Sequence, residues 1–299
     1  MSQTEMSDRL SARWARYVAA VEGELTAQLA ARRSEPAELG EAMAYAVMGP
    51  GKRVRPVLVL ASCEMVGGGI AAARAPAAAI ECVHAFSLVH DDLPSMDNDD
   101  LRRGRPTCHK AFGEAMALLA GDTLLVLAFE LIVTGVQPPE TAARMVAELA
   151  AATGYDGMAG GQADDVLGEG RPPDRQRVER IHRRKTARLI EAACRLGGLA
   201  GGAEGEDYEA LGAFGRELGL AFQIADDLLD ATGSAAVVGK QVGKDAASGK
   251  QTYPAVVGIE ASRQLADEHI GQAVASLSRF GDRAEFLRDL ACYVVARQS

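Results

Sequence analysis

The sequence predicts an all-α fold, a helical bundle around a central cavity. Alanine, leucine, glutamate and arginine, all strong helix formers, fill the long segments of the 299-residue chain. Apolar residues recur at the helical spacing of about 3.6, for example over residues 14–21 and 178–190. Strand patterns are scarce. Residues 57–61 could form a strand alone, but they continue into helix-forming sequence, so we expect a helix there.

Glycine- and proline-rich breaks divide the chain into segments that would hold roughly ten helices of ordinary length. The breaks lie at residues 49–51, 67–69, 137–139, 170–173 and 201–205. Since no Pro/Ser-rich linker, abrupt change of composition or short-period repeat interrupts this pattern, we expect residues 1–299 to form a single domain.

Composition argues against several classes of protein. The net charge of −9 disfavours nucleic acid as the main partner, because phosphate backbones attract basic surfaces. The cysteines are odd in number, scattered and without paired metal-ligand spacing, so we expect reduced thiols and a cytoplasmic protein. They are Cys63, Cys82, Cys108, Cys194 and Cys292.

Neither the N-terminus nor the most apolar stretch predicts a membrane segment. Residues 1–8 are polar and lack the layout of a signal peptide. Residues 124–136 are apolar but are interrupted by Glu130 and Thr134, and they are too short to span a bilayer. We therefore expect a buried helix there and no membrane span.

An aspartate cluster occurs twice, each time after an apolar helical run. The segment DDLPSMD at 91–97 follows residues 82–90, and DDLLD at 226–230 follows residues 218–225. Crowded carboxylates repel one another and lose hydration on an apolar helix, so the arrangement is costly without cations. Oxygen ligands select hard cations such as Mg²⁺, which bridge carboxylates to phosphates. The pair of clusters predicts a magnesium–diphosphate site with an apolar cavity behind it.

The two clusters differ in spacing. Asp226 and Asp230 are four residues apart, which places both on one face of a helix. Asp91 and Asp97 are six residues apart, but Pro94 can end the helix and turn Asp97 back. A solvated acidic turn is the ordinary explanation for one such cluster, and the second cluster weakens that explanation.

Basic residues accompany the aspartates. GKRVRP at 51–56 follows a glycine-proline turn, and RRGR at 102–105 follows the first cluster. Most basic runs are solvated surface, but arginine forks and lysine charges also bind phosphate, so a second diphosphate could bind without metal. Residues 232–252, rich in glycine, lysine and serine, are expected to form a mobile loop that closes over an anion. His84 shares a helix face with Asp91, where an ordinary core histidine is the simpler interpretation.

Taken in order, these motifs resemble those of the trans-isoprenyl diphosphate synthases, in particular the bacterial-type farnesyl diphosphate synthases. Each motif alone is weak, but the ordered set over residues 45–258 is specific. The matching segments are GKRVRP (51–56), ECVHAFSLVHDD (81–92), DDLRRG (99–104), PTCH (106–109), GGQ (160–162), HRRKT (182–186), FQIADDLLD (222–230) and GKQTYP (249–254).

The resemblance implies an isoprenoid-synthase-type bundle, a homodimer and about three Mg²⁺ ions per active site. It implies that the metal ligands are Asp91, Asp92, Asp97, Asp226, Asp227 and Asp230. It implies that the allylic diphosphate contacts Arg102, Lys185, Thr186, Gln223, Lys240 and Lys250. It assigns the diphosphate of isopentenyl diphosphate to Gly51, Lys52, Arg55, His84 and Arg103. The catalytic set it implies is Asp91, Asp92, Asp97, Lys185, Asp226 and Lys240.

The reaction implied by the resemblance is a head-to-tail condensation of isopentenyl diphosphate with dimethylallyl and then geranyl diphosphate. Metal ions and cations would stabilise the charge on the departing diphosphate. The double bond of isopentenyl diphosphate would attack the allylic cation, and the released diphosphate would take the proton. No protein base is assigned.

Product length is predicted from Phe86, which lies five residues before Asp91 and roughly 7.5 Å along the same helix. Its ring would form a floor beneath a C15 chain, and because Ser87 is small the floor depends on Phe86. Simple core packing of the ring is the alternative. Three other positions depart from the family pattern: Asp164 stands where leucine is usual, Arg188 stands at a usually small position, and Lys244 adds a positive charge in the loop.

Other functions stay open. A geranyl or geranylgeranyl diphosphate synthase of the same family would differ in product length. A terpene cyclase shares a first aspartate cluster, but usually carries an Asn/Ser/Glu metal motif in place of residues 226–230 and lacks residues 51–56. A metal phosphohydrolase, suggested by His90 and Asp91, would need a further upstream histidine, and none precedes His84. Non-catalytic prenyltransferase subunits tend to lose aspartates that both clusters retain here.

Overall fold

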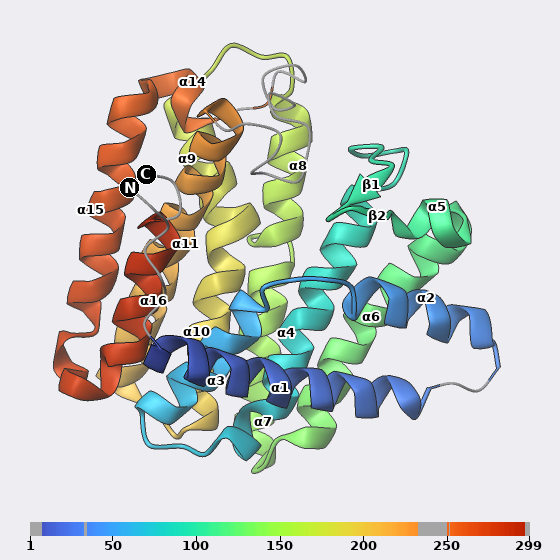
Figure 1. Ribbon diagram of the computed structural model, residues 1–299, viewed down its shortest axis with the longest axis horizontal. Helices are drawn as coiled ribbons and strands as arrows, with labels where there is room; N and C mark the ends of the chain where they lie inside the picture. The colour runs from blue at the N-terminus through green and yellow to red at the C-terminus, as the bar shows by residue number, and fades with distance from the viewer. Residues whose placement is uncertain (1–7, 33–34, 233–249, 251, 297–299) are drawn as a thin grey trace.

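Helices build almost all of the described structure (Figure 1). A computed structural model describes residues 8–32, 35–232, 250 and 252–296. The longer helices are α1 (Asp8–Ala30), α2 (Ala37–Val47), α3 (Val54–Met65), α4 (Ile70–Asp91), α6 (Glu114–Gly135), α7 (Pro139–Thr153), α8 (Met158–Gly168), α10 (Arg188–Ala200), α11 (Gly205–Thr232), α15 (Ile259–Ser276) and α16 (Glu285–Ala296). The shorter elements are strands β1 (Leu101–Arg102) and β2 (Arg105–Pro106), α5 (Cys108–Phe112), α9 (Arg175–His182), the π-helix Arg183–Ala187, α14 (Tyr253–Val257) and the 3₁₀ segment Ser278–Ala284.

The sequence prediction of helices separated by five breaks is confirmed. Each predicted break falls between two helices, and residues 57–61 lie inside α3. The β1–β2 hairpin was not predicted, since each strand has only two residues. The turn between them places Arg103 and Gly104 at positive φ, as two-residue hairpin loops require.

The two aspartate clusters lie on α4 and α11, two helices near the middle of the bundle. In Figure 1, α4, α6, α10 and α11 run roughly parallel, while α1 crosses one end of them. Helix α4 packs mainly on α6 and α3, and α11 packs mainly on α15 and α10. This packing fixes the directions in which the C-terminal halves of α4 and α11 present their carboxylates.

One large hydrophobic core draws residues from Leu10 in α1 to Ala291 in α16. A smaller cluster forms separately where α9, α11, α14 and α15 meet, and we call it the Tyr253 cluster. Its buried members are Val178, Ile224, Leu228, Tyr253 and Ala266. The second aspartate cluster lies on the stretch of α11 that supplies Ile224 and Leu228, so the Tyr253 cluster packs directly behind it.

Helix α6 is more exposed than the sequence predicted. Within the described part of the chain it is the one helix long and apolar enough to cross a membrane, and 44% of its most apolar window is buried. One side of α6 packs on α2, α4, α5 and α7, as a core helix does. The other side leaves Val126 and Val133 exposed, so the helix that was predicted to be buried is buried on one side only.

All five cysteines are free thiols, as predicted; Cys292 is exposed and the others are buried. Their compartment stays a prediction.

Candidate active site

The first aspartate cluster sits where α4 ends and the chain turns back. The amide of Asp97 donates a 2.8 Å hydrogen bond to the carbonyl of Asp91, and the amide of Asn98 donates one of 3.1 Å to Leu93. Asn98 adopts a left-handed conformation with φ of 50°, which asparagine tolerates better than most residues. The predicted turn that brings Asp97 back to Asp91 is therefore confirmed, with Pro94 inside it.

The surroundings of Asp91 disfavour the charged form of its carboxylate. Burial raises the pKa of Asp91, and the negative charges of Asp97 and Asp92 raise it further, while the positive charge of Lys185 lowers it. An additional cation at this point would relieve the repulsion. The site therefore has the property expected of a cation-binding carboxylate cluster.

Asp92 points away from its neighbour and is neutralised by the hairpin. It is buried, and Arg102 Nε and Nη2 donate to its two oxygens at 2.6–2.9 Å in a forked pair. The sequence reasoning assigned Asp92 to metal and Arg102 to the allylic diphosphate. In this structure the two side chains satisfy each other, so either role requires that pair to open.

The second aspartate cluster lies on α11 as predicted, but its three members have different surroundings. Asp226 is exposed and Asp230 is partly exposed. Asp227 is buried, and it accepts hydrogen bonds from the amide of Tyr253 at 2.9 Å and from Gln223 Nε2 at 3.1 Å. Consecutive helical residues point about 100° apart, and here Asp226 is exposed while Asp227 is buried, so the two carboxylates point in different directions. The structure disfavours Asp227 as a metal ligand.

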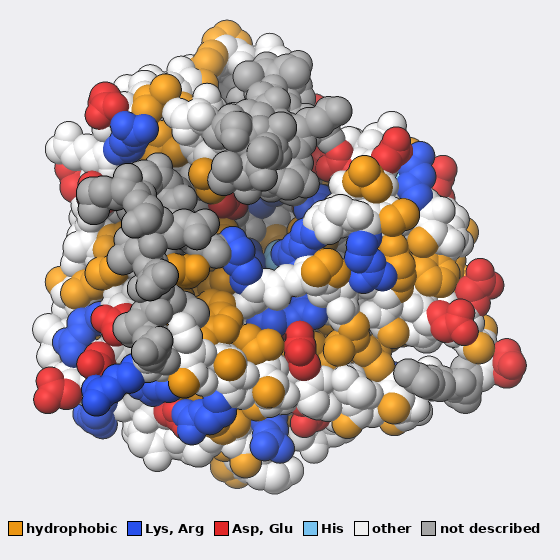
Figure 2. Space-filling model, viewed as in Figure 1, with side chains coloured by type: hydrophobic (Ala, Val, Ile, Leu, Met, Phe, Trp, Pro, Cys, Tyr) orange, Lys and Arg blue, Asp and Glu red, His pale blue; other side chains and the backbone are white. Residues whose placement is uncertain are grey.

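Two relationships place the clusters across one cleft. The charge of Asp226 on α11 acts on Arg55 of α3, and Lys250 Nζ lies 3.2 Å from Asp97 Oδ1. Figure 2 shows one face of the molecule with a hollow near its middle, which is ringed largely by lysine and arginine side chains. Among the residues that the structure describes, no three His, Cys, Asp or Glu side chains converge as a ready-made metal site.

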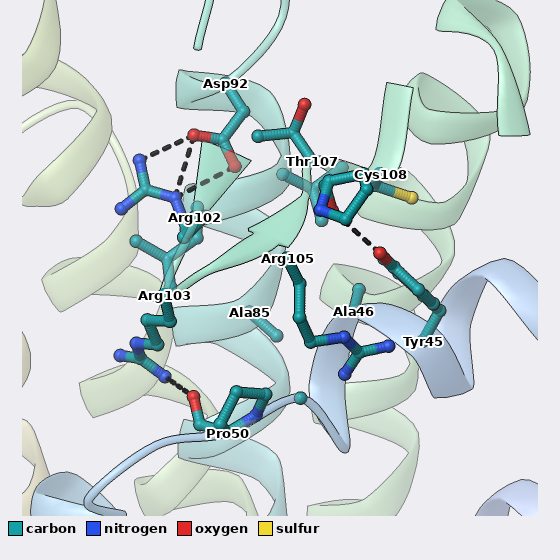
Figure 3. A pocket seen from close by; sticks show the side chains of 14 residues that line it. Tyr45, Ala46, Pro50, Ala85, Asp92, Arg102, Arg103, Arg105, Thr107 and Cys108 are labelled. Carbon is teal, nitrogen blue, oxygen red and sulfur yellow. Dashed lines mark hydrogen bonds and ion pairs between the residues drawn. The ribbon is translucent and has the colours of Figure 1, made fainter. Parts of the chain in front are cut away.

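The basic segment at 51–56 divides into a structural and a cavity-facing part. Arg53 is buried in an ion pair of 2.7 Å with Glu81 and also donates to the carbonyl of Gly49, so it anchors the loop. Arg103 reaches over from the hairpin and donates to the carbonyl of Pro50 at 2.6 Å (Figure 3). A Cβ on Gly51 would overlap Arg103 Nη1, so a larger residue there would make that guanidinium shift. Lys52 is exposed in the same loop.

Arg55 and His84 form a pair beneath the loop. Arg55 Nη1 lies 3.4 Å from His84 Nε2, and Arg55 Nε is buried without a hydrogen-bond partner. Burial and then the positive charge of Arg55 hold the pKa of His84 well below its usual value, so His84 is neutral and accepts from Arg55. An unsatisfied buried guanidinium N–H is costly, and an anion placed here would satisfy it. This geometry supports the predicted anion-binding role of both residues.

Lys185 is held by a residue that the sequence reasoning did not select. Its Nζ donates to Asp165 Oδ2 of α8 at 2.7 Å, and Asp165 is almost fully buried. Lys185 lies in the π-helix Arg183–Ala187, whose wider turn breaks the ordinary helical register. Gly161 allows the close approach, because a Cβ there would overlap the backbone nitrogen of Lys185. Gly161 belongs to the motif GGQ at 160–162, so the sequence did contain a signal for this close packing.

Thr186 and Gln223 join the π-helix to α11. Thr186 Oγ1 donates to Gln223 Oε1 at 2.7 Å, and the amide group of Gln223 donates on to Asp227. Both residues lie beside Lys185 and Asp226 on the predicted allylic side of the cleft. The structure thus brings together most residues predicted there; Lys240 and the rest of the predicted loop over 233–249 lie outside the described residues, as does Lys244.

A pocket of about 470 Å³, partly open to solvent, lies behind the hairpin (Figure 3). Its floor includes Ala46 and Ala85, and its walls include Arg102, Arg103 and Arg105. Arg105 stacks over the ring of Tyr45 with its guanidinium carbon 4.2 Å from the ring centre. The hydroxyl of Tyr45 donates to the carbonyl of Pro106 at 2.7 Å. These contacts fix the hairpin, and hence the positions of Arg102 in β1 and Arg103 in the turn.

The predicted chain-length residue Phe86 is partly buried against the main core. Its ring meets His90 edge-on at 5.1 Å, and His90 Nε2 lies 3.1 Å from the carbonyl of Leu118 in α6. Ser87 donates to the carbonyl of His84 and adds little bulk. Phe86 therefore lies on α4 beside His90, which contacts α6, and it is less than two turns from Asp91.

Residues 36–284 match the sequence profile of the polyprenyl synthetase family. The chain belongs to this family. Farnesyl diphosphate synthase of Escherichia coli (strain K12) is 47% identical over 265 residues, which cover 86% of this chain and 88% of the relative. The chloroplastic geranylgeranyl pyrophosphate synthase 11 of Arabidopsis thaliana is 47% identical over 272 residues, covering 89% of this chain and 76% of the relative.

Solved structures give the same result for this polyprenyl synthetase. An FPP/GFPP synthase from Zymomonas mobilis superposes with a TM-score of 0.85 at 38% identity, covering 96% of this chain and 99% of that one. Geranylgeranyl pyrophosphate synthetase from Pyrococcus horikoshii gives a TM-score of 0.88 at 32% identity, with 97% and 99% covered. The all-α fold is confirmed, and the protein is a prenyltransferase of isoprenoid biosynthesis that acts on isopentenyl and allylic diphosphates. The terpene cyclase and phosphohydrolase alternatives are set aside.

Proposed function

We propose that this protein is a farnesyl diphosphate synthase, which condenses isopentenyl diphosphate with dimethylallyl and then geranyl diphosphate. The C15 product is supported by the position of Phe86, a bulky ring on α4 that packs against the core and His90 less than two turns from Asp91. A growing chain that enters along α4 from the aspartates would meet that ring. The similarity to the Escherichia coli farnesyl diphosphate synthase over most of both chains supports the same product.

The donor set fits Mg²⁺. Asp91 and Asp97 offer carboxylate oxygens on one wall, and Asp226 and Asp230 offer them on the other; oxygen ligands suit this ion. The raised pKa of Asp91, caused by burial and by neighbouring negative charge, is consistent with a position that a cation would stabilise. When bound, Mg²⁺ would neutralise diphosphate charge in the cleft.

The chain's own cations supply the rest of the chemistry in this proposal. Lys185 and Lys250 lie beside Asp91 and Asp97, where they would donate to the departing allylic diphosphate and stabilise its charge. Arg55, with its unpartnered Nε, would hold the diphosphate of isopentenyl diphosphate on the opposite side. The two substrates would then be fixed with the double bond aimed at the allylic carbon, which converts a bimolecular encounter into an oriented reaction.

The test is incubation with isopentenyl diphosphate and each allylic starter, with and without Mg²⁺, followed by chromatography of the dephosphorylated products. We expect farnesol as the main alcohol from dimethylallyl and geranyl starters, and no elongation without the metal. Asp226→Asn should raise the Mg²⁺ requirement. Absence of elongation under all conditions would refute the proposal.

Geranylgeranyl diphosphate synthesis is the second candidate. Several Arabidopsis relatives that match most of this chain at 45–47% identity are named geranylgeranyl pyrophosphate synthases. Geranylgeraniol as the main alcohol in the same experiment would favour this candidate over the first.

A second copy of this chain is the proposed partner of α6. The outward side of this helix exposes Leu118, Leu119, Val126 and Val133, the last two at 65% and 59%. A row of exposed apolar side chains on one helix is typical of a surface that another protein covers. Light scattering should show a dimer, and Val126→Lys should shift it towards the monomer; a monomeric wild-type protein would contradict the pairing.

A further inference from the structure

Asp227 connects three separate elements through one buried carboxylate. It is 4% exposed, and it lies on α11 next to the exposed Asp226. Its Oδ2 accepts from the amide of Tyr253 at 2.9 Å and lies 3.4 Å from His182 Nε2, while its Oδ1 accepts from Gln223 at 3.1 Å. The carboxylate therefore joins α11 to the end of α9 and to the start of α14.

The contact with Tyr253 fixes the first residue of α14. Tyr253 is buried in the Tyr253 cluster, and its ring centre lies 5.1 Å from that of His182. Thr252, immediately before it, caps the short helix by accepting from the amide of Ala255. Removing the carboxylate would leave the Tyr253 amide buried without its acceptor, which is an unfavourable state for a backbone group.

Lys250 lies three residues before this anchor. Its ammonium reaches across the cleft to Asp97, with Nζ 3.2 Å from Oδ1 and 3.4 Å from Oδ2. Three residues of extended chain span only about 10 Å, so the position of the Tyr253 amide limits where Lys250 can reach. Tyr253 and Lys250, three residues apart, are thus held by Asp227 and by Asp97 respectively.

The same carboxylate orients the allylic side of the cleft. Because Asp227 accepts from the Nε2 group of Gln223, the Oε1 of Gln223 is left to face Thr186, whose hydroxyl donates to it at 2.7 Å. A metal ligand must direct its lone pairs into the cleft, whereas both oxygens of Asp227 are engaged by protein donors behind it.

We propose that Asp227 is a positioning residue, which holds Lys250 and Gln223 in place for the allylic diphosphate, and that it does not bind Mg²⁺. The inference rests on the proposed function, since it assigns a role within the same site. Its neighbour Asp226, exposed on the cleft side, provides a matched comparison one residue away.

The experiment compares Asp227→Asn with Asp226→Asn in the full-length protein. An asparagine can accept from Tyr253 but must turn its own NH₂ towards another donor, so one of the hydrogen bonds is lost. For Asp227→Asn we expect at least about a fivefold rise in the KM for geranyl diphosphate, with the half-saturating Mg²⁺ concentration changed less than about twofold. For Asp226→Asn we expect the half-saturating Mg²⁺ concentration to rise at least about tenfold.

Two measurements on the metal-free protein separate this inference from the proposed function. Asp227→Asn should lower the melting temperature and increase the rate of tryptic cleavage after Lys250, whereas Asp226→Asn should change neither. Equal behaviour of the two variants in Mg²⁺ requirement, melting and cleavage would overturn the positioning role, whatever product the enzyme makes.

Hydrogen exchange in the wild-type protein tests the same point if Asp227→Asn does not fold. The Tyr253 amide should be protected without metal and should stay protected when Mg²⁺ and inorganic pyrophosphate are added. Faster exchange of that amide on addition would mean that Asp227 leaves Tyr253 for the metal, and the inference would be wrong.

Discussion

Asp165 of α8 accepts a hydrogen bond from Lys185 Nζ at 2.7 Å, with the carboxylate buried and the ammonium about three-quarters covered. Asp164, the residue beside it, faces outward and binds Arg180 and Arg184 at 3.0 and 3.1 Å. Two consecutive carboxylates on α8 thus hold basic side chains of α9 and of the π-helix. Only the contact of Asp165 leads directly to a residue of the cleft.

Asp165→Asn is expected to impair catalysis, since a buried hydrogen bond between charged groups contributes about 1.5–3 kcal/mol and orients Lys185. We predict a loss of roughly tenfold or more in kcat/KM for the allylic diphosphate. Steady-state kinetics with varied geranyl diphosphate measures this. Asp164→Asn is the matched control: it removes partly exposed ion pairs to Arg180 and Arg184, neither of which is a predicted substrate ligand, so its kinetics should stay close to wild type. Equal losses in both variants would argue against a specific role for Asp165.

Gly51→Ala is expected to weaken the binding of isopentenyl diphosphate. The added methyl group would displace the Arg103 guanidinium from the carbonyl of Pro50. We predict a higher KM for isopentenyl diphosphate and an almost unchanged KM for the allylic substrate. Gly23→Ala serves as control, because no atom lies within 4 Å of its added Cβ in α1 and alanine favours a helix by about 1 kcal/mol. That variant should be active and slightly more stable; an unaltered KM in Gly51→Ala would exclude the steric argument.

His84 should make the protein less stable in mild acid. Burial and then Arg55 hold the pKa of His84 well below the value of about 6.5 that it has in the unfolded chain. Below pH 6.5 the unfolded chain therefore takes up a proton that the folded protein does not. The free energy of unfolding then decreases with falling pH, by at most about 1.4 kcal/mol per pH unit from this residue.

Denaturant unfolding of wild type and His84→Gln between pH 7.5 and 5 measures this effect. Glutamine cannot take up the proton, so the variant should lose less stability than wild type over that range. Parallel curves for the two proteins would show that His84 does not titrate differently on unfolding.

Phe86→Ala is expected to lengthen the product. The substitution removes the ring that packs on the core below Asp91, and Ser87 is too small to replace it. Chromatography of the dephosphorylated products should show C20 or longer alcohols in place of C15. A cavity of this size in the core would also destabilise the protein by about 3 kcal/mol or more, so melting should be measured alongside. Unchanged C15 output from a folded variant would remove the chain-length role of Phe86.

The helical bundle could be predicted because apolar spacing and glycine-proline breaks are local signals, and both were read correctly, as α3 and its flanking breaks show. The return of Asp97 to Asp91 could also be predicted, since Pro94 cannot continue a helix. The different orientations of Asp226 and Asp227 follow from the helical repeat, but the chain alone does not say which of the two faces the core. The structure shows that Asp227 faces the core, where it accepts a hydrogen bond from the amide of Tyr253, a residue distant in sequence.

Other features of the site lay beyond sequence reasoning for a geometric reason. The partner of Lys185 depends on a π-helix, which shifts the register that ordinary helical spacing assumes. The pairing of Asp92 with Arg102 depends on a hairpin with strands of two residues, too short to leave a strand pattern. Both features are tertiary contacts, and the spacing of their residues along the sequence follows neither a helix nor a strand period.

The main-chain link from Asp97 to Asp91, in the turn that contains Pro94, means that the side chain of Ser95 is not needed to hold the distance. Pro94, Ser95 and Met96 are all solvent-exposed on the rim of the cleft. A spectroscopic label attached at Ser95 would thus sit at the entrance as a reporter of substrate arrival, on a part of the enzyme whose chemistry it leaves untouched.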